Sequence, residues 1–132
     1  MPHITLDYSA NLEPDIDIAG LCNHLRQAAI STGALPMAGI RVRAFAATHV
    51  SIADGDPKHG YIDISVRLRA GRDLATRQAA TKTIFDAARD FLAPVMQRRS
   101  LALSFEMRDI DPAVSPKCGT IRDHLTKDAP ND

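Results

Sequence analysis

The chain has 132 residues, enough for one domain of ordinary size and too few for two domains with separate cores. Sixteen basic and sixteen acidic side chains cancel to a formal net charge of zero. Nucleic-acid binding needs a basic excess or aromatic stacking surfaces, and the chain has two Tyr, four Phe and no Trp. We therefore expect no nucleic-acid partner. No apolar run approaches the roughly 18 residues of a membrane span, so we expect no membrane partner either.

The N-terminus and the cysteines favour a reduced, cytoplasmic protein. The first residues lack the basic start and the apolar block of a signal peptide. Cys22 and Cys118 match no metal-binding or redox spacing. No phosphate loop or nucleotide fingerprint is present, so we expect no cofactor. We also expect no metal, because no His pair is spaced i,i+4 and no Cys or carboxylate stands at ligand spacing from any of the five: His3, His24, His49, His59 and His124.

Alternation and helical spacing divide the first part of the chain into three elements. From His3 to Tyr8 apolar and polar residues alternate, which predicts a half-buried strand. A helix is predicted next, capped by Asp15 or Asp17 and ended by Gly33, because apolar residues recur at spacings of three and four: Ile18, Leu21, Cys22, Leu25, Ala28 and Ala29. A second alternating run follows Pro36: Ile40, Val42 and Ala44 against Arg41, Arg43 and Phe45.

The second part repeats this order after a turn-rich loop at 53–60. A third strand is predicted from the alternation of Ile62, Ile64, Val66 and Leu68 with polar residues. A long helix opens after Gly71 with Asp73 as its cap, and Pro94 predicts a kink or an early end. A fourth strand carries Leu101, Leu103, Phe105 and Met107 on one side. The tail from Asp111 can hold a short helix near residues 121–125.

The predicted fold class is α/β (α+β), with two consecutive β-α-β units forming a four-stranded sheet. Strands joined through a helix run parallel with a right-handed crossover, so both helices should cover the same face. We expect a single domain over 1–125, with units at about 2–52 and 60–109 and a short C-terminal segment. Residues 126–132 are expected to fray.

The uncovered face of this sheet collects polar residues, which leaves two interpretations open: a solvated face, or an oligomer interior in which charges pair between subunits. Its members are His3, Thr5, Asp7, Arg41, Arg43, Asp63, Ser65, Arg67, Arg69, Ser104, Glu106 and Arg108.

Pro2 is the one residue whose place alone suggests chemistry. Aminopeptidases remove an initiator Met when the next side chain is small, and the product would carry a free prolyl amine at the start of a strand. Such an amine can act as a base at neutral pH if burial and nearby cations lower its pKa. Retention of Met1 would make the Pro2 nitrogen an amide and exclude this chemistry. Most proteins that begin Met-Pro do not use the amine.

Four runs of sequence make the chain similar to a known family: Met1-Pro-His-Ile, residues 33–43 with Leu35-Pro-Met-Ala-Gly-Ile-Arg-Val-Arg, Ala70-Gly-Arg-Asp-Leu, and Ser100-Leu-Ala-Leu-Ser-Phe-Glu. From Pro2 to about Leu125 the chain resembles the 5-carboxymethyl-2-hydroxymuconate Δ-isomerase family of the tautomerase superfamily. The Pro start is shared across that superfamily, whereas Ala38-Gly-Ile-Arg and Leu101-Ala-Leu-Ser-Phe-Glu are the specific parts.

The resemblance implies a tautomerase-like homotrimer with an amino-terminal proline as base, and no cofactor. Its two matching arginines correspond here to Arg72 and Arg41, which would bind substrate with Pro2 as the catalytic group. Arg43 either assists them or forms an ion pair between subunits. The second unit has no terminal amine, so one site per chain follows.

The implied reaction is the dienol-to-enone tautomerisation of 5-carboxymethyl-2-hydroxymuconate in homoprotocatechuate (4-hydroxyphenylacetate) degradation. This small anionic substrate carries three carboxylates, which planar guanidinium groups bind in bidentate fashion. Two alternatives remain. The same fold and proline could hydrate, decarboxylate or dehalogenate a small unsaturated acid, or the chain could be a binding protein on the same scaffold.

Overall fold

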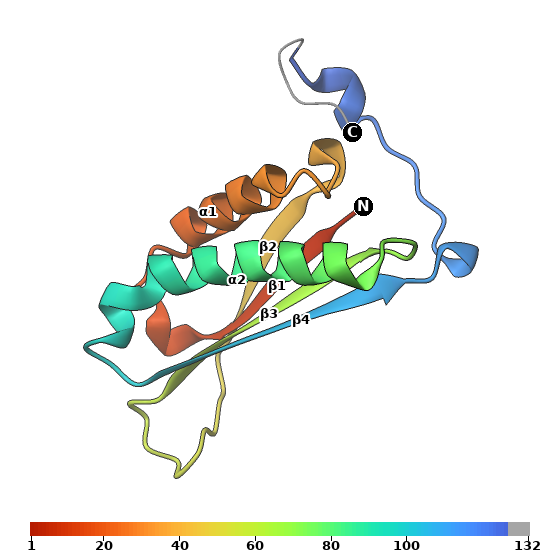
Figure 1. Ribbon diagram of the computed structural model, residues 1–132. Coiled ribbons are helices and arrows are strands. Elements are labelled where there is room, and N and C mark those ends of the chain that lie inside the picture. Colours follow the sequence, from red (N-terminus) through yellow and green to blue (C-terminus); the bar gives the residue numbers. More distant parts are fainter. Residues whose placement is uncertain (127–132) are drawn as a thin grey trace.

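A sheet of four strands carries two helices on one face in the computed structural model, which describes residues 1–126 (Figure 1). The strands are β1 (His3–Ser9), β2 (Arg41–Ala47), β3 (Gly60–Arg69) and β4 (Leu101–Ile110). The helices are α1 (Ile18–Ser31) and α2 (Leu74–Met96). Four short 3-10 turns complete the described elements: η1 (Ala10–Leu12), η2 (Met37–Gly39), η3 (Pro112–Val114) and η4 (Ile121–His124).

The strand order β2-β1-β3-β4 places the first strand of each unit at the centre of the sheet. β1 runs parallel to β2 and β3 runs parallel to β4, whereas β1 and β3 are antiparallel. Each β-α-β unit is therefore a parallel pair, and the two units join through their first strands. The predicted fold class is confirmed.

The core lies between the sheet and the two helices. Alternate residues of the central strands are fully buried, as the period-2 pattern predicts: Ile4, Leu6, Ile62, Ile64 and Val66. The helices cover them with Leu21, Leu25, Ile84, Ala88 and Leu92. Burying each of the larger aliphatic side chains contributes about 1.5–3 kcal/mol, so this layer is the main source of stability.

Both helices begin at the predicted aspartates. The Asp17 carboxylate accepts a hydrogen bond from the Gly20 N–H at 2.9 Å, and the Asp73 carboxylate accepts one from the Thr76 N–H at 2.8 Å. Caps of this kind are worth about 1 kcal/mol each. Gly33 follows α1 with a φ of +68°, the left-handed conformation that commonly ends a helix.

Pro94 was expected to kink the second helix or to end it early, and α2 continues past Pro94 to Met96. Pro94 is exposed in the last turn, where a carbonyl without a backbone donor can bond to water. After β1, η1 turns Leu12 inward, where it is fully buried. The short helix expected in the tail is η4, whereas the tail that was expected to fray lies, after Thr126, outside the described residues.

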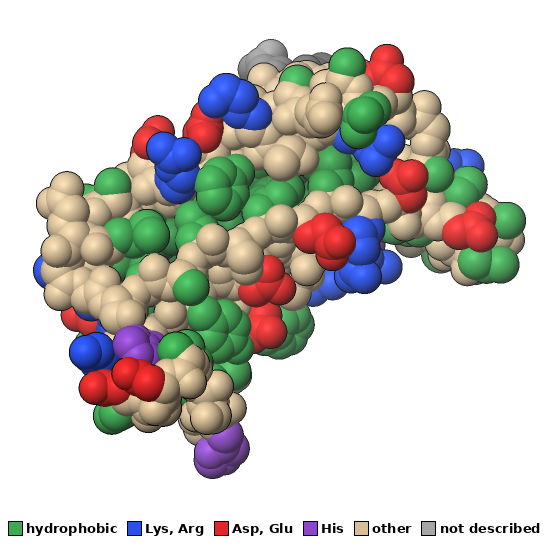
Figure 2. Space-filling view, turned by 60° about the horizontal axis from the view of Figure 1, so that its bottom comes forward, with side chains coloured by type: hydrophobic (Ala, Val, Ile, Leu, Met, Phe, Trp, Pro, Cys, Tyr) green, Lys and Arg blue, Asp and Glu red, His purple; other side chains and the backbone are tan. Residues whose placement is uncertain are grey.

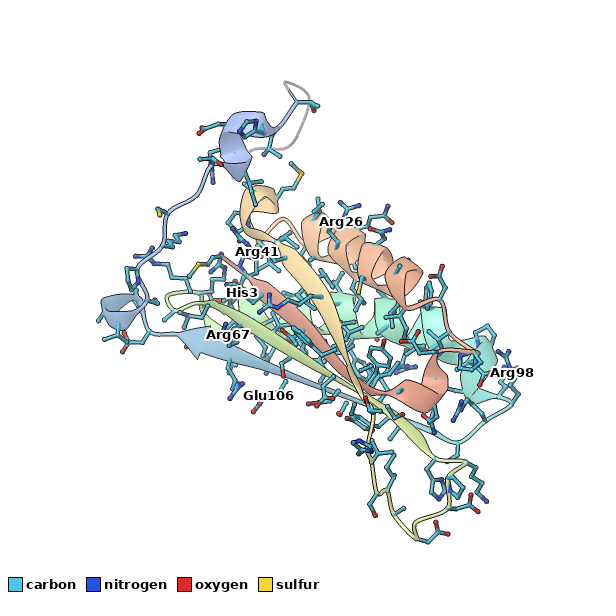
Figure 3. All side chains as sticks on the ribbon, turned by 180° about the vertical axis from the view of Figure 1, so that it is seen from behind. His3, Arg26, Arg41, Arg67, Arg98 and Glu106 are labelled. Carbon is cyan, nitrogen blue, oxygen red and sulfur yellow. The ribbon has the colours of Figure 1, made fainter. Side chains whose placement is uncertain are left out.

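The uncovered face of the sheet is divided by charge along the strands. His3 pairs in register with Arg41 on one side and Arg67 on the other, and Figure 3 shows the three side chains near the same end of the sheet. At the other end Asp7 stands directly opposite Asp63. The strand register thus gathers cations at the end where β1 begins.

Hydrophobic side chains gather in a hollowed band on the face shown in Figure 2, with acidic and basic side chains on either side. Among the helices of residues 1–126, none combines the length and the apolar character that crossing a membrane requires.

Candidate functional site

The first two residues are held against the start of β2. Pro2 is buried, and its carbonyl accepts a hydrogen bond from the Arg41 N–H at 3.1 Å. Gly39, at the end of η2, lies so close that a Cβ there would be 3.1 Å from both Met1 Cα and Pro2 Cδ. Gly39 is therefore the residue that permits this close approach.

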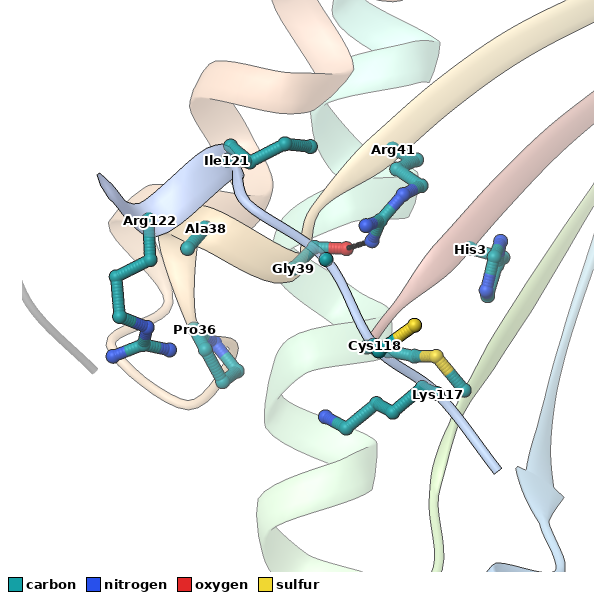
Figure 4. Close-up of a pocket in the computed structure, with 11 residues that line it drawn as sticks. His3, Pro36, Ala38, Gly39, Arg41, Lys117, Cys118, Ile121 and Arg122 are labelled. Atoms are coloured by element: carbon teal, nitrogen blue, oxygen red, sulfur yellow. Dashed lines mark hydrogen bonds between the residues drawn. The ribbon is translucent and has the colours of Figure 1, made fainter. Parts of the chain in front are cut away.

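A cavity of about 350 Å³ opens beside the amino terminus (Figure 4). Its walls come from three parts of the chain: the start of β1, the segment that leads into β2, and the segment that follows β4. The lining residues are Met1, His3, Pro36, Ala38, Gly39, Arg41, Lys117, Cys118, Gly119, Ile121 and Arg122.

Arg41 is the predicted site arginine that lines this cavity. It is the first residue of β2, and its Nη1 donates to the Gly39 carbonyl at 2.8 Å. That bond occupies one edge of the guanidinium and fixes its position. The remaining N–H donors can bind a carboxylate or an enolate oxygen.

Arg72, the second predicted arginine, lies in the turn before α2 and is held by backbone carbonyls. Its Nε donates to the Ala34 carbonyl at 3.0 Å, and its Nη1 donates to the Arg69 carbonyl at 3.1 Å. Arg72 is not among the residues that line the cavity. Its positive charge nevertheless lowers the pKa of the amino group at Met1. The fold thus brings an arginine of the second β-α-β unit near the start of the first.

The amino group at Met1 is the most strongly perturbed cationic group near the cavity. Its pKa is lowered from 8.0 to about 6. Burial is the largest cause, and four positive charges lower the pKa further: Lys117, Arg72, Arg41 and Arg69. An amine with a pKa near 6 is mostly unprotonated at neutral pH and can accept a proton.

Arg43 does not line the cavity. Its Nη1 lies 3.1 Å from His3 Nδ1 on the uncovered face of the sheet. Burial lowers the pKa of His3, and the charges of Arg43, Arg67 and Arg41 lower it further. The positive charges therefore favour the neutral form of His3, which lines the cavity and contacts Arg43.

Sequence reasoning did not single out three residues of this site. Gly39 belongs to the Ala38-Gly-Ile-Arg run, but its contact with Met1 depends on the pairing of β1 with β2. Lys117 belongs to an aperiodic, Pro-rich segment, where no pattern predicts a position. Arg69, which the alternation placed on the uncovered face of the sheet, lines a second cavity of about 10 Å³ with Met1 and Lys117.

No group of three or more His, Cys, Asp or Glu side chains in residues 1–126 is arranged to hold a metal ion. The donor set of the cavity is cationic, which suits an anionic ligand.

The sequence model of the 5-carboxymethyl-2-hydroxymuconate isomerase family matches residues 2–125. The chain belongs to this family. The 5-carboxymethyl-2-hydroxymuconate Delta-isomerase of Escherichia coli is 32% identical over 117 residues, which cover 89% of this chain and 93% of that protein. The resemblance inferred from the sequence is confirmed, and with it the expected enzyme class: the chain is an isomerase of the tautomerase superfamily.

Solved structures agree with this family assignment. A crystal structure of a 5-carboxymethyl-2-hydroxymuconate delta-isomerase has a TM-score of 0.89 at 30% identity, covering 98% of this chain and 96% of that one. A 5-carboxymethyl-2-hydroxymuconate isomerase from Deinococcus radiodurans R1 has a TM-score of 0.87 at 27% identity, covering 96% of this chain and 95% of that one. The F6 fused 4-OT asymmetric trimer, with a TM-score of 0.65 at 18% identity over 92% and 98%, shows the shared fold alone.

Proposed function

We propose that this isomerase converts the dienol 5-carboxymethyl-2-hydroxymuconate into its enone, with Pro2 as the proton-transferring group after Met1 is removed. The proposal is carried by one observation: the amino terminus lies beside a cavity of about 350 Å³ with four positive charges acting on it. The names of the relatives supply the substrate.

The proposed reaction moves one proton and needs no cofactor. The Pro2 amine takes the proton of the 2-hydroxyl group, and the oxygen becomes a ketone as the C2=C3 double bond moves to C3=C4. The C4=C5 electrons then take the same proton from the amine at C5. Atoms and charge balance within the substrate, so the protein supplies a base, a conjugate acid and cations.

Removal of Met1 is the step that creates the base. In the chain that begins at Met1, the Pro2 nitrogen is an amide, which is neither basic nor nucleophilic. Met1 itself lines the cavity, and the buried Pro2 lies directly behind it. A Pro2 amine exposed by the loss of Met1 would open into the same cavity and meet the same cations.

We assign the three predicted arginines different roles. Arg41, which lines the cavity, binds the 2-oxygen or a carboxylate. Arg72 acts mainly through its charge, because its donors are bonded to the carbonyls of Ala34 and Arg69. Arg43 acts indirectly through its contact with His3.

The lining of the cavity favours isomerisation over the addition of water. Hydration and dehalogenation need a group that activates water, usually a carboxylate in this superfamily. None of the described residues that line the cavity is Asp or Glu. The cavity therefore offers cations to an acidic substrate, and the proposed Pro2 amine is its base.

We further propose a homotrimer in which the uncovered sheet faces meet, acting in the cytoplasm in homoprotocatechuate degradation. Asp7 and Asp63 face each other across β1 and β3, a like-charge pair that cations of a second subunit would relieve. A neighbour with the same fold is named as a trimer.

The test follows the dienol by its ultraviolet absorbance and identifies the product by mass. Wild-type protein should convert 5-carboxymethyl-2-hydroxymuconate to a product of equal mass. Pro2→Ala should retain its circular dichroism spectrum and lose turnover by at least about tenfold. The primary amine of Ala differs from the prolyl amine in pKa and geometry, and a well-placed general base typically accelerates a reaction ~10²–10⁴-fold. A product heavier by one water, or full turnover by Pro2→Ala, would contradict the proposal.

A further inference from the structure

The segment that follows β4 returns along the outside of the amino terminus. Its start is fixed at Asp111, whose carboxylate accepts the Ala113 N–H at 2.9 Å and whose carbonyl accepts the Ser115 hydroxyl at 2.6 Å. Beyond that point Lys117 and Cys118 lie on the stretch that crosses in front of Gly39 (Figure 4).

Lys117 is placed between two cavities that share Met1. It lines the larger cavity with Arg41 and the smaller one with Arg69. Within residues 1–126 its ammonium makes no ion pair, whereas Lys58 pairs with Asp56 and Lys82 pairs with Asp86. The three ammonium donors of Lys117 are therefore available to a ligand.

The two predicted arginines near the amino terminus have part of their donors occupied. Arg41 donates to the Gly39 carbonyl, and Arg72 donates to two carbonyls without lining the cavity. Among the charged side chains, Lys117 also contributes the largest lowering of the pKa of the amino group, ahead of all three arginines that act on it. Its charge therefore acts at the amino terminus, where the loss of Met1 would expose the proposed base.

We propose that Lys117 binds a carboxylate of the substrate, so that the segment around it forms part of the binding site. The inference rests on the proposed function, because it takes the cavity at the amino terminus as the site of a multiply carboxylated dienol. A flexible ammonium is a point charge that suits a single carboxylate oxygen, whereas the fixed Arg41 suits a planar group.

Steady-state kinetics give the first test. Lys117→Ala should raise KM for 5-carboxymethyl-2-hydroxymuconate at least tenfold. Lys117→Arg, which keeps the charge, should have a KM close to that of the wild type. Loss of the charge also raises the pKa of the amine, so the acid side of the kcat/KM profile should move to higher pH. Lys58→Ala, which removes one exposed charge at the other end of the sheet, is the control and should change neither quantity. Unchanged KM in Lys117→Ala would overturn the proposal.

Binding without turnover gives the second test. Pentane-1,2,5-tricarboxylate has the same three carboxylates and no double bond, and Cys118 is an exposed thiol on the cavity wall. In a Cys22→Ser background the tricarboxylate should slow the reaction of Cys118 with a thiol reagent, and Lys117→Ala should require at least tenfold more of it.

The two tests separate the two proposals. Protection of Cys118 that depends on Lys117, in a protein that does not isomerise the dienol, would sustain the carboxylate site and reject the proposed function. No protection in the wild type, or equal protection in Lys117→Ala, would reject the role of Lys117 even if the enzyme is active.

Discussion

An amine that serves as a base at neutral pH must be mostly unprotonated and must still return its proton to carbon. Burial and cations lower the pKa of the amino group at Met1 to about 6, and a Pro2 amine exposed by the loss of Met1 would lie among the same cations. A conjugate acid whose pKa is lowered in this way gives up its proton readily, which meets the second condition. The positive charges around Met1 thus adjust the base as well as attract an acidic substrate.

The two arginines should be separable by kinetics. If Arg41 stabilises charge on the 2-oxygen, Arg41→Ala should raise the barrier by about 2–4 kcal/mol and lower kcat, as the loss of an oxyanion donor does. Arg72→Ala should leave kcat nearly unchanged at high pH. It removes one cation, so it should raise the pKa of the amine, and kcat/KM at pH 6 should fall relative to its value at pH 8.

The measurement is kcat and KM for each variant between pH 5 and 9, with thermal unfolding as the control for folding. An Arg41→Ala protein that folds and keeps wild-type kinetics would remove Arg41 from the site. An Arg72→Ala profile that does not move would show that its charge has no influence on the base.

At the scale of elements, the close approach of η2 to the first strand makes Gly39 sensitive. A Cβ at residue 39 would lie 3.1 Å from Pro2 Cδ, and this contact does not depend on Met1. Gly39→Ala should therefore displace Pro2 by a few tenths of an ångström and lower kcat by about tenfold, because small misplacements of reacting groups are costly. Gly39→Val, with a larger side chain, should lower kcat further.

Thermal unfolding distinguishes a displaced base from a damaged fold. We expect Gly39→Ala to unfold within a few degrees of the wild type, because the contact lies at the end of a strand. Wild-type kcat in Gly39→Ala would show that the spacing between η2 and Pro2 is unimportant.

The elements themselves were predictable because their periodicities report burial directly. Ile4 and Leu6 alternate with polar residues in β1, and both are fully buried. Pro2 was singled out by its place at the start of the chain and was assigned as the base through the family resemblance, which also named Arg41 and Arg72. Lys117 could not be found this way, because its position depends on the path of a Pro-rich segment without periodicity. The bond from Arg72 to Ala34 was equally hidden, since it joins two units that are distant in sequence.

At the scale of the whole molecule, the charge division of the uncovered face predicts how subunits meet. Three chains of 14.3 kDa should sediment together at micromolar concentration in analytical ultracentrifugation. Asp63→Lys tests whether the charges of the uncovered face hold the subunits together. In a solvated monomer it would relieve repulsion with Asp7 and raise the melting temperature, whereas in the trimer it would remove a carboxylate paired with a neighbouring cation and promote dissociation.

A species of 14.3 kDa for the wild type would contradict the trimer. A more stable Asp63→Lys protein with unchanged assembly would show that the acidic end of the sheet faces solvent.

The central claim is that the free Pro2 amine is the base, and the most direct test compares protein with and without Met1. Inhibition of methionine aminopeptidase during expression yields the Met1-retaining form, and intact mass spectrometry establishes which form each sample contains. The ultraviolet assay on 5-carboxymethyl-2-hydroxymuconate then gives the turnover of both. We predict that protein beginning at Pro2 is active and that protein retaining Met1 has no activity beyond its processed fraction. Full turnover by a sample proven to retain Met1 would contradict the mechanism.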